Sequence, residues 1–597
     1  MSSPDPIDLV LRDLIDTLLQ ENVYGLADIV HACAEPPEPG AELAERERWC
    51  RIAVTSGWLV FRGRDGGALQ PYRFSRGPLW HCGGAEGPRT LAPSELLTIL
   101  ASKHGAGTRT AEVAADLRAS VEHAAVTLAG SLSLPERVPR PGGMLAAERL
   151  AATRNRPFHP TARAAAGWSA AELARYGPMR RGALGVDWVG VRRDGVRYGS
   201  GADSNRMEHL VLGDHELELL AEAAHRAGVN LDQYQPLPVH PWQFEHVLPR
   251  EYASELDTRD VVPLTRGLGR FHPTSSLRTL TTAPESELHL KLPLGVATLG
   301  AARLLPPRYL DNAERAQHTM RRLLTSDPRL GTLVDLCDER TWCGWRSPDA
   351  DDEFADRPGQ LAAQVRAYPG GLFGDPDSLI LPMAALAAHE WQVLHPAIGE
   401  AGFDDDPVRL FRLQAESFCA LGFGFLRYGV LPELHGQNVV VVLAQGAVRR
   451  FVLRDHDTLR LYPEWMRASG VPDPGYRIKP GATQSLRLPS AQALLGYLQT
   501  LGFQVNLYGI ADALARHYDL DERALWSQLR EAVIACLDRL GLPGRVADVL
   551  DRELLRATEW PSRQVLRPLL RRGRSAGVSM PASAGRVPNP LLPKPRR

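Results

Sequence analysis

The sequence predicts an α+β protein built from several subdomains. The chain has 597 residues, which is too long for a single compact core. Its apolar and charged contents, 44% and 23%, are ordinary for a globular protein. Helical and strand-like segments are mixed before Pro382, and the chain becomes largely helical after it. We therefore expect a mixed architecture of separate parts.

The first part is expected to span residues 1–143. Apolar residues at helical spacing predict a helix at Ile7–Leu19 and a second helical region at Ser94–Ala129. Between them, Ile52–Phe74 has the pattern of strands and turns punctuated by glycines. The Pro- and Gly-rich stretch Pro135–Gly143 predicts a linker that ends this part.

Two further parts are expected, residues 144–381 and 382–597. The third is mainly helical and is interrupted by a predicted hairpin at Val439–Leu461. From Trp560 onward the chain carries nine Lys or Arg and no acid, which is typical of a solvated tail. In the middle part, strands are predicted at Val186–Tyr198 and Glu287–Leu294, and helices at His215–Ala227 and Asn312–Leu324.

Charge and cysteine usage exclude several classes of protein. The 69 Lys and Arg against 70 Asp and Glu give no bulk attraction to nucleic acid or membrane. The seven cysteines are scattered, odd in number and without a C-x-x-C pair, which argues against a disulfide framework or a cysteine-ligated metal. The N-terminus lacks a basic region, and the longest aliphatic run, Val439–Ala444, is far short of the ~20 residues of a membrane span. We expect a cytoplasmic protein with neither nucleic-acid nor membrane partners.

The most informative motif surrounds the predicted hairpin. It begins with Glu433-Leu-His-Gly-Gln-Asn438 and ends with Arg454-Asp455. A turn near Gln445-Gly446 would place Asp455 opposite His435–Asn438, so that Glu433, Asn438 and Asp455 converge. Three oxygen ligands suit Mg²⁺, and His435 and Gln437 could face a nucleotide. The alternative is a polar hairpin end exposed to water.

A second motif has the chemistry of a triphosphate site. It comprises Ser275, Ser276, Arg278 and Thr279 in a predicted turn, followed by Lys291 in a predicted strand. Hydroxyls, an arginine fork and a lysine point charge are the usual means of holding phosphates. No G-x-x-x-x-G-K-[ST] loop occurs in the sequence. The alternative is an ordinary loop followed by a strand with an exposed lysine.

Two shorter motifs are weaker. In His240-Pro-Trp242-Gln243 the tryptophan is expected to pack, while His240 could lie at the edge of a site. In Phe158-His159-Pro160, followed by Arg163, a histidine before proline is usually structural.

Taken together and in order, these motifs resemble the NRPS-independent siderophore synthetases of the IucA/IucC type. The resemblance covers about residues 150 to 590 and is specific because several independent motifs occur in the family's order. The matching stretches are Arg156–Pro160, Val239–Gln243, Thr274–Thr279, Leu290–Leu294, Arg303, Glu433–Asn438, Arg454–Asp455 and Val587–Leu591.

The resemblance implies a cupped-hand fold of thumb, fingers and a kinase-like palm, with Mg·ATP bound between fingers and palm. It also implies the reaction. A carboxylate attacks the α-phosphate of ATP and expels pyrophosphate, and an amine or hydroxyl then attacks the acyl-adenylate and releases AMP. The expected partners are therefore a small carboxylic acid and an amine or hydroxyl substrate, and a homodimer is expected.

The resemblance also assigns roles residue by residue. His435, Arg303 and Lys291 would be catalytic. Glu433, Asn438 and Asp455 would bind Mg²⁺. ATP would be bound by Ser275, Ser276, Arg278, Thr279, Lys291 and Gln437, and the acyl substrate by His159, Arg163, Thr298 and Arg303.

The sequence departs from the family pattern on the acyl side. Arg163 and Ala165 stand where the family usually has Lys-x-Arg, and Leu299 stands where it has a threonine near a citrate-like acid. An isobutyl group cannot hydrogen-bond a carboxylate, so we hypothesise that free citrate is a poor substrate. The alternative is that Thr298 takes the threonine role through a register shift of one residue.

Three other functions compete with this reading. A kinase-like phosphotransferase would release ADP, but its catalytic aspartate would be expected where this chain has Gln437. A non-catalytic acid- or nucleotide-binding member of the family is disfavoured by the intact Lys291, His435, Asn438 and Asp455. A ferric-siderophore reductase would need a cysteine cluster near the C-terminus, where Cys536 stands alone.

Overall fold

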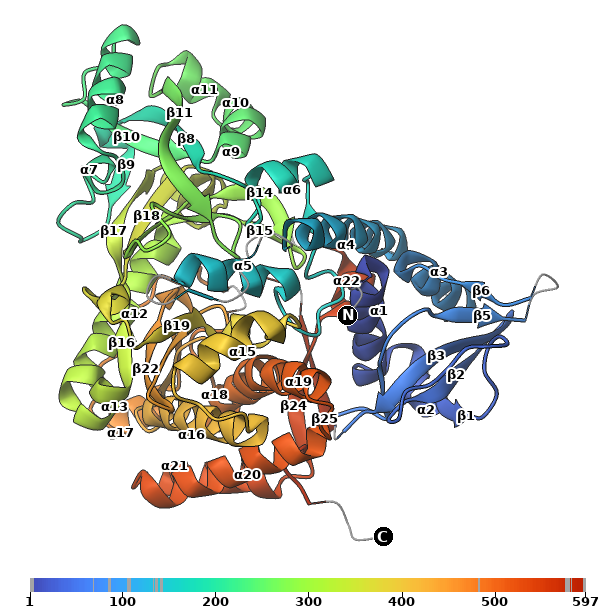
Figure 1. Cartoon of the computed structure of the whole chain (residues 1–597). Helices are drawn as coiled ribbons and strands as arrows, with labels where there is room; N and C mark the ends of the chain where they lie inside the picture. Colours follow the sequence, from blue (N-terminus) through green and yellow to red (C-terminus); the bar gives the residue numbers. More distant parts are fainter. Residues whose placement is uncertain are drawn as a thin grey trace.

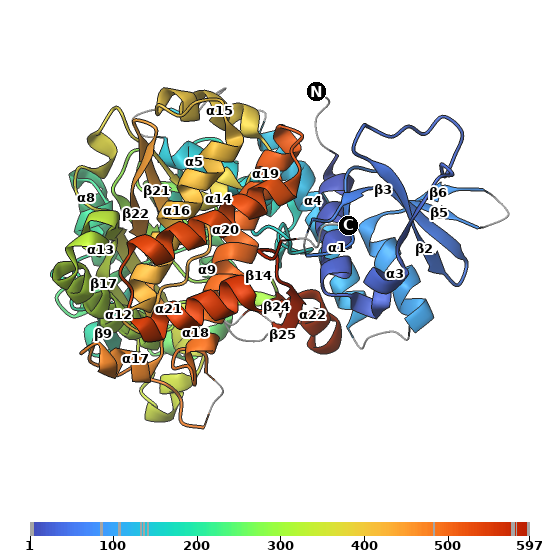
Figure 2. The ribbon, with the colours of Figure 1, turned by 90° about the horizontal axis from the view of Figure 1, so that it is seen from below.

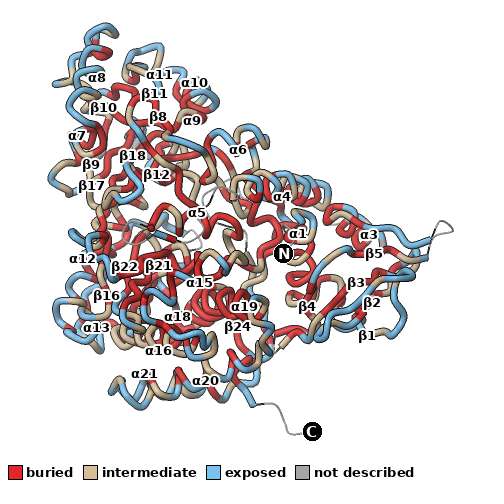
Figure 3. Tube along the Cα trace, viewed as in Figure 1, coloured by how far each residue is buried: buried red, intermediate tan, exposed pale blue. Residues whose placement is uncertain are grey.

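The computed structural model describes residues 5–67, 69–83, 87–104, 109–131, 134, 138–139, 143–481, 484–574, 580 and 582–593. Most of the predicted linker Pro135–Gly143 lies outside these residues. The chain forms three units, each around its own hydrophobic core (Figure 1). Buried segments line the interior of each unit, and exposed ones follow the periphery (Figure 3).

The N-terminal unit is an antiparallel sheet covered by helices, drawn in blue in Figure 1. Its sheet has the order β1-β2-β3-β5-β6, with β4 paired to β3. The predicted helices and the strand-and-turn region are confirmed. The elements are α1 (Pro6–Gln20), α2 (Leu26–Ile29), β1 (His31–Cys33), β2 (Arg48–Val54), β3 (Gly57–Asp65), β4 (Tyr72–Phe74), β5 (Trp80–Cys82), β6 (Arg89–Thr90), α3 (Pro93–His104) and α4 (Thr110–Ser131).

The middle unit contains an eight-stranded sheet of order β10-β8-β11-β12-β13-β18-β17-β9 and a small sheet of order β15-β14-β7. Its strands are β7 (Ala165–Ala166), β8 (Leu184–Arg192), β9 (Val196–Tyr198), β10 (Tyr234–Val239), β11 (Val261–Pro273), β12 (Thr279–Thr281), β13 (Leu288–Lys291), β14 (Leu294–Thr298), β15 (Ala301–Arg303), β17 (Asp338–Trp345) and β18 (Ala362–Ala367). Its helices are α6 (Ala170–Tyr176), α7 (Glu208–Val211), α8 (Asp214–Arg226), α9 (Pro241–His246), α10 (Leu248–Glu251) and α11 (Ala253–Asp257).

The C-terminal unit surrounds a four-stranded sheet of order β16-β22-β21-β19 with helices. Its strands are β16 (Val334–Leu336), β19 (Leu379–Pro382), β20 (Val430–Leu431), β21 (Val439–Ala444), β22 (Ala447–Leu453), β23 (Arg460–Leu461), β24 (Glu559–Gln564) and β25 (Ser583–Pro588). Its helices are α12 (Pro307–Ser326), α13 (Pro328–Leu333), α14 (Met383–Leu386), α15 (Trp391–Glu400), α16 (Pro407–Leu426), α17 (Pro463–Ala468), α18 (Ala491–Tyr497), α19 (Tyr508–His517), α20 (Glu522–Arg539) and α21 (Gly544–Leu550).

Helices that cross between units join them into one body. Helix α5 (Met144–Arg154), which precedes the strands of the middle unit, contributes Leu150 to the core of the C-terminal unit. Helix α22 (Leu566–Arg572) instead places Leu566 and Leu569 in the core of the N-terminal unit. Figure 2 shows α22, β24 and β25 between these two units.

The expectation of a solvated tail from Trp560 is therefore wrong for the described part of this segment. Trp560 is fully buried, and α22 packs against the N-terminal unit. Three consecutive backbone N–H groups at the start of α22, from Val565 to Arg567, donate to the Glu21 carboxylate. The many positive charges of this segment suggested exposure to solvent, but its apolar residues are buried. They pack against the N-terminal unit, more than 400 residues away in the chain.

The predicted hairpin and its register are confirmed. Strands β21 and β22 are antiparallel, with Val439 opposite Leu453. Gln445 and Gly446 both have positive φ, as a tight hairpin turn between right-handed twisted strands requires. Beyond the ladder, Arg454 N–H donates to Asn438 O at 3.1 Å, which keeps the two chain ends together.

Two further observations bear on the protein class. All seven cysteines are free thiols. Across the portion of the chain that the structure describes, no helix combines the length and hydropathy that a membrane crossing demands.

Candidate active site

Lys291 and Asp455 meet where the middle and C-terminal units face each other. Lys291 ends strand β13, is 4% exposed, and forms an ion pair with the Asp455 carboxylate just beyond β22. Arg366, on the neighbouring strand β18, donates to the same carboxylate oxygen at 2.5 Å. Burial opposes ionisation, but Arg366 and Lys291 hold the pKa of Asp455 well below its ordinary value. The aspartate is therefore an anion at neutral pH.

Glu339, on strand β17, fixes the backbone of this aspartate. Its carboxylate accepts hydrogen bonds from the N–H groups of Asp455, at 2.9 Å, and His456, at 3.2 Å. The same carboxylate pairs with Arg366 Nε at 2.6 Å. Asp455 has a φ of +62°, which non-glycine residues rarely adopt, so these contacts maintain an unfavourable backbone conformation.

The three predicted magnesium ligands, Glu433, Asn438 and Asp455, line one small cavity. Glu433 also accepts hydrogen bonds from Arg460 at 3.2 Å and from the Thr458 hydroxyl at 3.1 Å. Nowhere among the described residues do three or more His, Cys, Asp or Glu side chains gather as a metal site. The donor set nevertheless fits Mg²⁺, which takes a few carboxylate or amide oxygens and completes its shell with phosphates and water.

The predicted phosphate loop, Ser275–Thr279, connects β11 to β12. Ser275 donates from its hydroxyl to Glu148 of α5 at 2.5 Å, and its N–H donates to the same oxygen at 3.2 Å. The Ser276 hydroxyl is buried and has no hydrogen-bond partner within the described chain. Arg278 donates to Leu304 O at 2.5 Å, which leaves other N–H groups of its fork for a ligand. An orphaned hydroxyl and a guanidinium in the same loop suit phosphate oxygens.

His435 and Gln437 lie between the loop and the hairpin. His435 Nδ1 accepts from Gln437 N–H at 3.2 Å, so its proton lies on Nε2, which is 3.9 Å from a Glu433 oxygen. Burial lowers the pKa of His435 although Glu433 opposes the shift, so the ring is neutral at pH 7. The Gln437 amide lies 3.5 Å from the Ser275 hydroxyl.

Thr298 and Arg303 pair across the β14–β15 hairpin. Arg303 Nε donates to the Thr298 hydroxyl, and an Arg303 terminal nitrogen donates to Thr298 O at 2.8 Å. Leu299 and Gly300 occupy the turn with φ values of +55° and +76°. The threonine that lies beside Arg303 is therefore Thr298, as in the register alternative considered above. Leu299 therefore does not leave Arg303 without a neighbouring hydroxyl, and the hypothesis that free citrate is a poor substrate stays a prediction.

His159 is a fully buried, neutral imidazole. Its Nδ1 accepts from Thr161 N–H at 3.3 Å, while its Nε2 finds no partner in the residues that the structure describes. Burial, followed by Arg156 and Arg303, lowers the pKa of His159 well below its ordinary value. An unpaired, buried N–H group next to cations is suited to hydrogen-bond an anionic ligand.

Arg163 lies apart from this cluster. Its guanidinium forms a buried ion pair with Asp13 of α1 at 2.5 Å, and its Nε donates to Thr153 O. This contact joins the middle unit to the N-terminal unit and neutralises the charge that sequence analysis assigned to the acyl substrate.

Several residues of the site escaped the sequence analysis. Arg156 and Arg563 lie near His159, and burial together with Arg563 lowers the pKa of Arg156 to about 9. Arg563 belongs to the segment interpreted as a tail, so only the fold could place it here. Glu148, Glu339 and Arg366 are charged residues within otherwise ordinary helices or strands, and their pairing depends on tertiary structure.

The His240–Gln243 motif supports the fold. His240 caps α9 by accepting the Trp242 N–H at 3.2 Å. The Gln243 amide oxygen accepts from Gly295 N–H at 2.7 Å and so holds the start of β14, the strand that carries Thr298.

Comparisons with known proteins identify the family. Residues 143–388 match the family described as IucA / IucC. Staphyloferrin B synthase of Staphylococcus aureus is 30% identical over 585 residues, which cover 98% of this chain and 97% of that protein. Aerobactin synthase of Escherichia coli is 25% identical over 48% of this chain and 51% of its own length.

Two solved structures share the fold. The petrobactin biosynthesis protein AsbB from Bacillus anthracis superposes with a TM-score of 0.78 at 17% identity, covering 98% of this chain and 95% of that chain. The ATP-bound aerobactin synthetase IucA from Klebsiella pneumoniae gives a TM-score of 0.73, also at 17% identity, covering 98% and 100%.

Residues 424–577 also match a family described as ferric iron reductase FhuF-like transporter. Cys536 is the only cysteine in this stretch of the sequence and is buried. An iron–sulfur centre needs several cysteine ligands, so this match does not bring reductase chemistry with it. The near full-length relative and the match over residues 143–388 show that the chain belongs to the IucA/IucC family of NRPS-independent siderophore synthetases.

Proposed function

We propose that this protein adenylates a carboxylate of citrate or a citrate derivative with ATP and condenses the acyl group with an amine or hydroxyl. The observation that carries the proposal is the ion pair between Lys291 and Asp455 at the end of the hairpin. The phosphate loop adds the unpartnered Ser276 hydroxyl, and His159 is buried and neutral. A cationic, hydroxyl-bearing loop and an anionic hairpin end then face each other, as binding of a metal–triphosphate complex requires.

The nucleotide half of the site uses fixed charges. Lys291 and Arg278 bind phosphate oxygens, and the Ser276 hydroxyl donates the hydrogen bond that it lacks within the chain. Glu433, Asn438 and Asp455 would hold Mg²⁺, which when bound supplies charge neutralisation at the phosphates.

The acid half of the site supplies hydrogen-bond donors. Arg303, the Thr298 hydroxyl and the Nε2–H of His159 bind the carboxylate. One carboxylate oxygen then attacks the α-phosphorus, and the bond to pyrophosphate breaks. The neutral His435 donates its Nε2–H to an α-phosphate oxygen and stabilises the negative charge that develops there.

In the second step the amine attacks the acyl carbon, the bond to AMP breaks, and the amine loses a proton. The relatives' names include a synthase of staphyloferrin B, a synthase of aerobactin and a citryl-spermidine ligase. We infer that the acid of this protein belongs to the same polycarboxylate class. A cytoplasmic location and a homodimer remain predictions, and light scattering would measure the oligomeric state.

The test is ATP–pyrophosphate exchange with a panel of acids that includes citrate, 2-oxoglutarate and succinyl-hydroxamates. We expect acid-dependent exchange, and AMP rather than ADP once an amine is added. A reaction without enzyme serves as the blank. Formation of ADP would support the phosphotransferase instead, and the absence of exchange with every acid would contradict the proposed function.

A further inference from the structure

The turn that carries His159 has an unusual backbone. Asn155 and Phe158 both have a φ of +59°, within a single turn that leaves helix α5. A phenylalanine in the left-handed region is uncommon because its Cβ approaches the following carbonyl oxygen. Such a conformation persists only where the surroundings hold it, and it is found most often at functional sites.

Phe158 is held from both sides by other units of the protein. Its ring stacks on Tyr508 of α19, with 4.7 Å between centroids and an interplanar angle of 23°. The guanidinium groups of Arg73 and Arg154 lie 5.1 and 5.2 Å from its ring centroid. The Thr17 hydroxyl of α1 donates to Asp13 O at 2.6 Å and shares this hydrogen bond with the Phe158 carbonyl oxygen at 3.2 Å.

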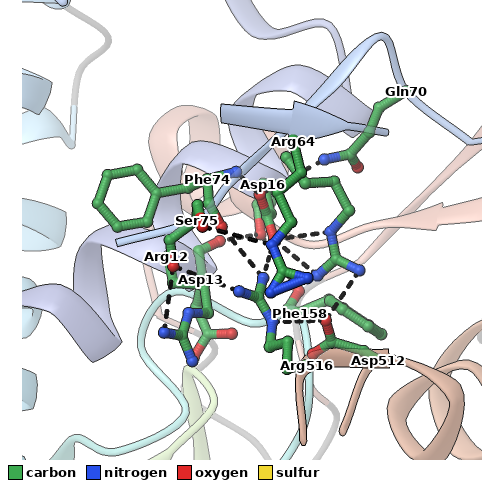
Figure 4. A network of polar contacts seen from close by, with 12 residues as sticks. Arg12, Asp13, Asp16, Arg64, Gln70, Phe74, Ser75, Phe158, Asp512 and Arg516 are labelled. Atoms are coloured by element: carbon green, nitrogen blue, oxygen red, sulfur yellow. Dashed lines mark hydrogen bonds and ion pairs between the residues drawn. The ribbon is translucent and has the colours of Figure 1, made fainter. Parts of the chain in front are cut away.

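Arg73, on strand β4 of the N-terminal unit, is itself immobilised. Its guanidinium pairs with Asp16 at 2.7 Å, Asp512 at 3.0 Å and Glu522 at 2.8 Å, and it donates to the Tyr508 hydroxyl at 2.8 Å. Figure 4 shows Phe158 and Asp512 within this network. Moving Arg73 would break several buried, charge-assisted hydrogen bonds.

Further contacts surround Pro157, the residue before Phe158. Helix α19 approaches this proline so closely that a Cβ added at Gly509 would lie 2.8 Å from its ring. Arg154 anchors the start of the turn, because it donates to Gly509 O at 3.2 Å and pairs with Asp512 at 2.5 Å. The turn therefore has little freedom to adopt another backbone conformation.

His159 follows Phe158 directly. A change of the Phe158 backbone to an ordinary conformation would rotate the following peptide and displace the buried imidazole. We propose that Phe158 is a positioning residue through which Arg73 and Thr17 of the N-terminal unit set the orientation of His159 for the acid. This inference rests on the proposed function in one respect, which is that the acid is the ligand of His159.

Steady-state kinetics with citrate as the probe acid test the proposal. Phe158→Ala should raise the KM for citrate about ten-fold or more, equivalent to about 1.4 kcal/mol, while the KM for ATP stays within about two-fold. Phe158→Tyr retains the stacked ring and should restore the citrate KM. If citrate is inactive with the wild-type protein, the best acid of the exchange panel replaces it.

A double-mutant cycle separates positioning from general destabilisation. In the His159→Ala background, Phe158→Ala should change the acid KM by less than about two-fold, because the residue through which it acts is absent. Fully additive effects would overturn the proposal. The matched control is Phe244→Ala, which removes another buried phenylalanine under an arginine, Arg266 at 4.7 Å, and should leave the ratio of the acid and ATP KM values unchanged.

A crystal structure of the Phe158→Ala variant gives a readout that does not depend on activity. We expect the His159 ring to leave its wild-type position. A His159 ring that keeps its wild-type position in this variant would overturn the positioning role, whatever the kinetic result. If the wild-type protein shows no exchange with any acid, the proposed function fails, whereas a displaced ring in the variant still supports the positioning role.

Discussion

The Ser275 hydroxyl donates a 2.5 Å hydrogen bond to one oxygen of Glu148, and the other oxygen of Glu148 pairs with Arg454 at 2.6 Å. Glu148 is fully buried on α5. Ser275 begins the phosphate loop, and Arg454 directly precedes Asp455. A single carboxylate therefore joins the two halves of the nucleotide site, although it need not touch the nucleotide itself.

Glu148→Gln should lower kcat/KM for ATP. The amide keeps a hydrogen bond to Ser275 but leaves the Arg454 charge without its partner, and hydrogen bonds to charged groups contribute about 1.5–3 kcal/mol. We expect a loss of about ten-fold or more in pyrophosphate exchange, together with a lower Tm. Glu218→Gln, at a side chain that is 77% exposed on α8, should change neither quantity appreciably. Equal effects of the two substitutions would contradict the role of Glu148.

Lys291→Ala should weaken ATP binding or slow adenylation by about ten-fold or more, since one charge-assisted phosphate contact contributes about 1.5–3 kcal/mol. The variant also leaves Arg366 as the remaining cation on Asp455. Calorimetric titration with ATP measures the effect on binding, and exchange measures the effect on the reaction. Wild-type values in both assays would show that Lys291 only neutralises Asp455.

Asp455→Asn should abolish Mg²⁺-dependent turnover, because Asn retains the size of the side chain but removes the charge that fits the metal. Raising the Mg²⁺ concentration should not restore activity. Asp335→Asn, which removes a surface ion pair with Arg450 on the neighbouring strands, is the matched control and should remain active. Near-normal turnover of Asp455→Asn at saturating Mg²⁺ would exclude Asp455 as a metal ligand.

Thr298→Val should raise the KM for the acid and leave the KM for ATP unchanged, because it removes the hydroxyl that lies beside Arg303. Loss of one such hydrogen bond to a charged group costs about 1.5–3 kcal/mol. Leu299→Asn, at the turn residue with positive φ, should be tolerated because Asn adopts this backbone region readily. The reverse pattern, with a large effect only at Leu299, would reinstate the argument that the acyl pocket lacks a threonine.

Asp512→Asn should destabilise the protein at neutral pH. Burial opposes ionisation of Asp512, but Arg516, Arg73 and Arg154 hold its pKa well below the ordinary value. The ionised group therefore stabilises the fold above the unfolded pKa of about 3.9, and this contribution is lost as the pH falls through the folded pKa. Breaking a buried pair costs about 3–5 kcal/mol. We expect the Tm difference from wild type to be largest near pH 7 and to shrink below about pH 4; a difference independent of pH would contradict the assignment.

The sequence by itself determined the local elements and the family. The Gln445-Gly446 turn was enough to predict the hairpin register, because the turn preference acts within a few residues. The same register brought Asn438 next to Arg454. The order of the polar motifs along the chain was enough to indicate the family, which the near full-length relative confirms.

Only the tertiary structure decided which buried charges meet. Glu148, Glu339 and Arg366 gave no signal in the sequence, because a charged residue in a helix or strand is usually solvated and its partner depends on the order of distant strands. Arg163 was assigned to the acid by position, yet α1 supplies Asp13 as its partner from 150 residues away. The turn of Phe158 depends on Thr17, Arg73 and Tyr508 together. These contacts form only when the three units pack against one another. A charge that becomes buried needs a partner, and here the partner comes from a segment that is distant in the sequence.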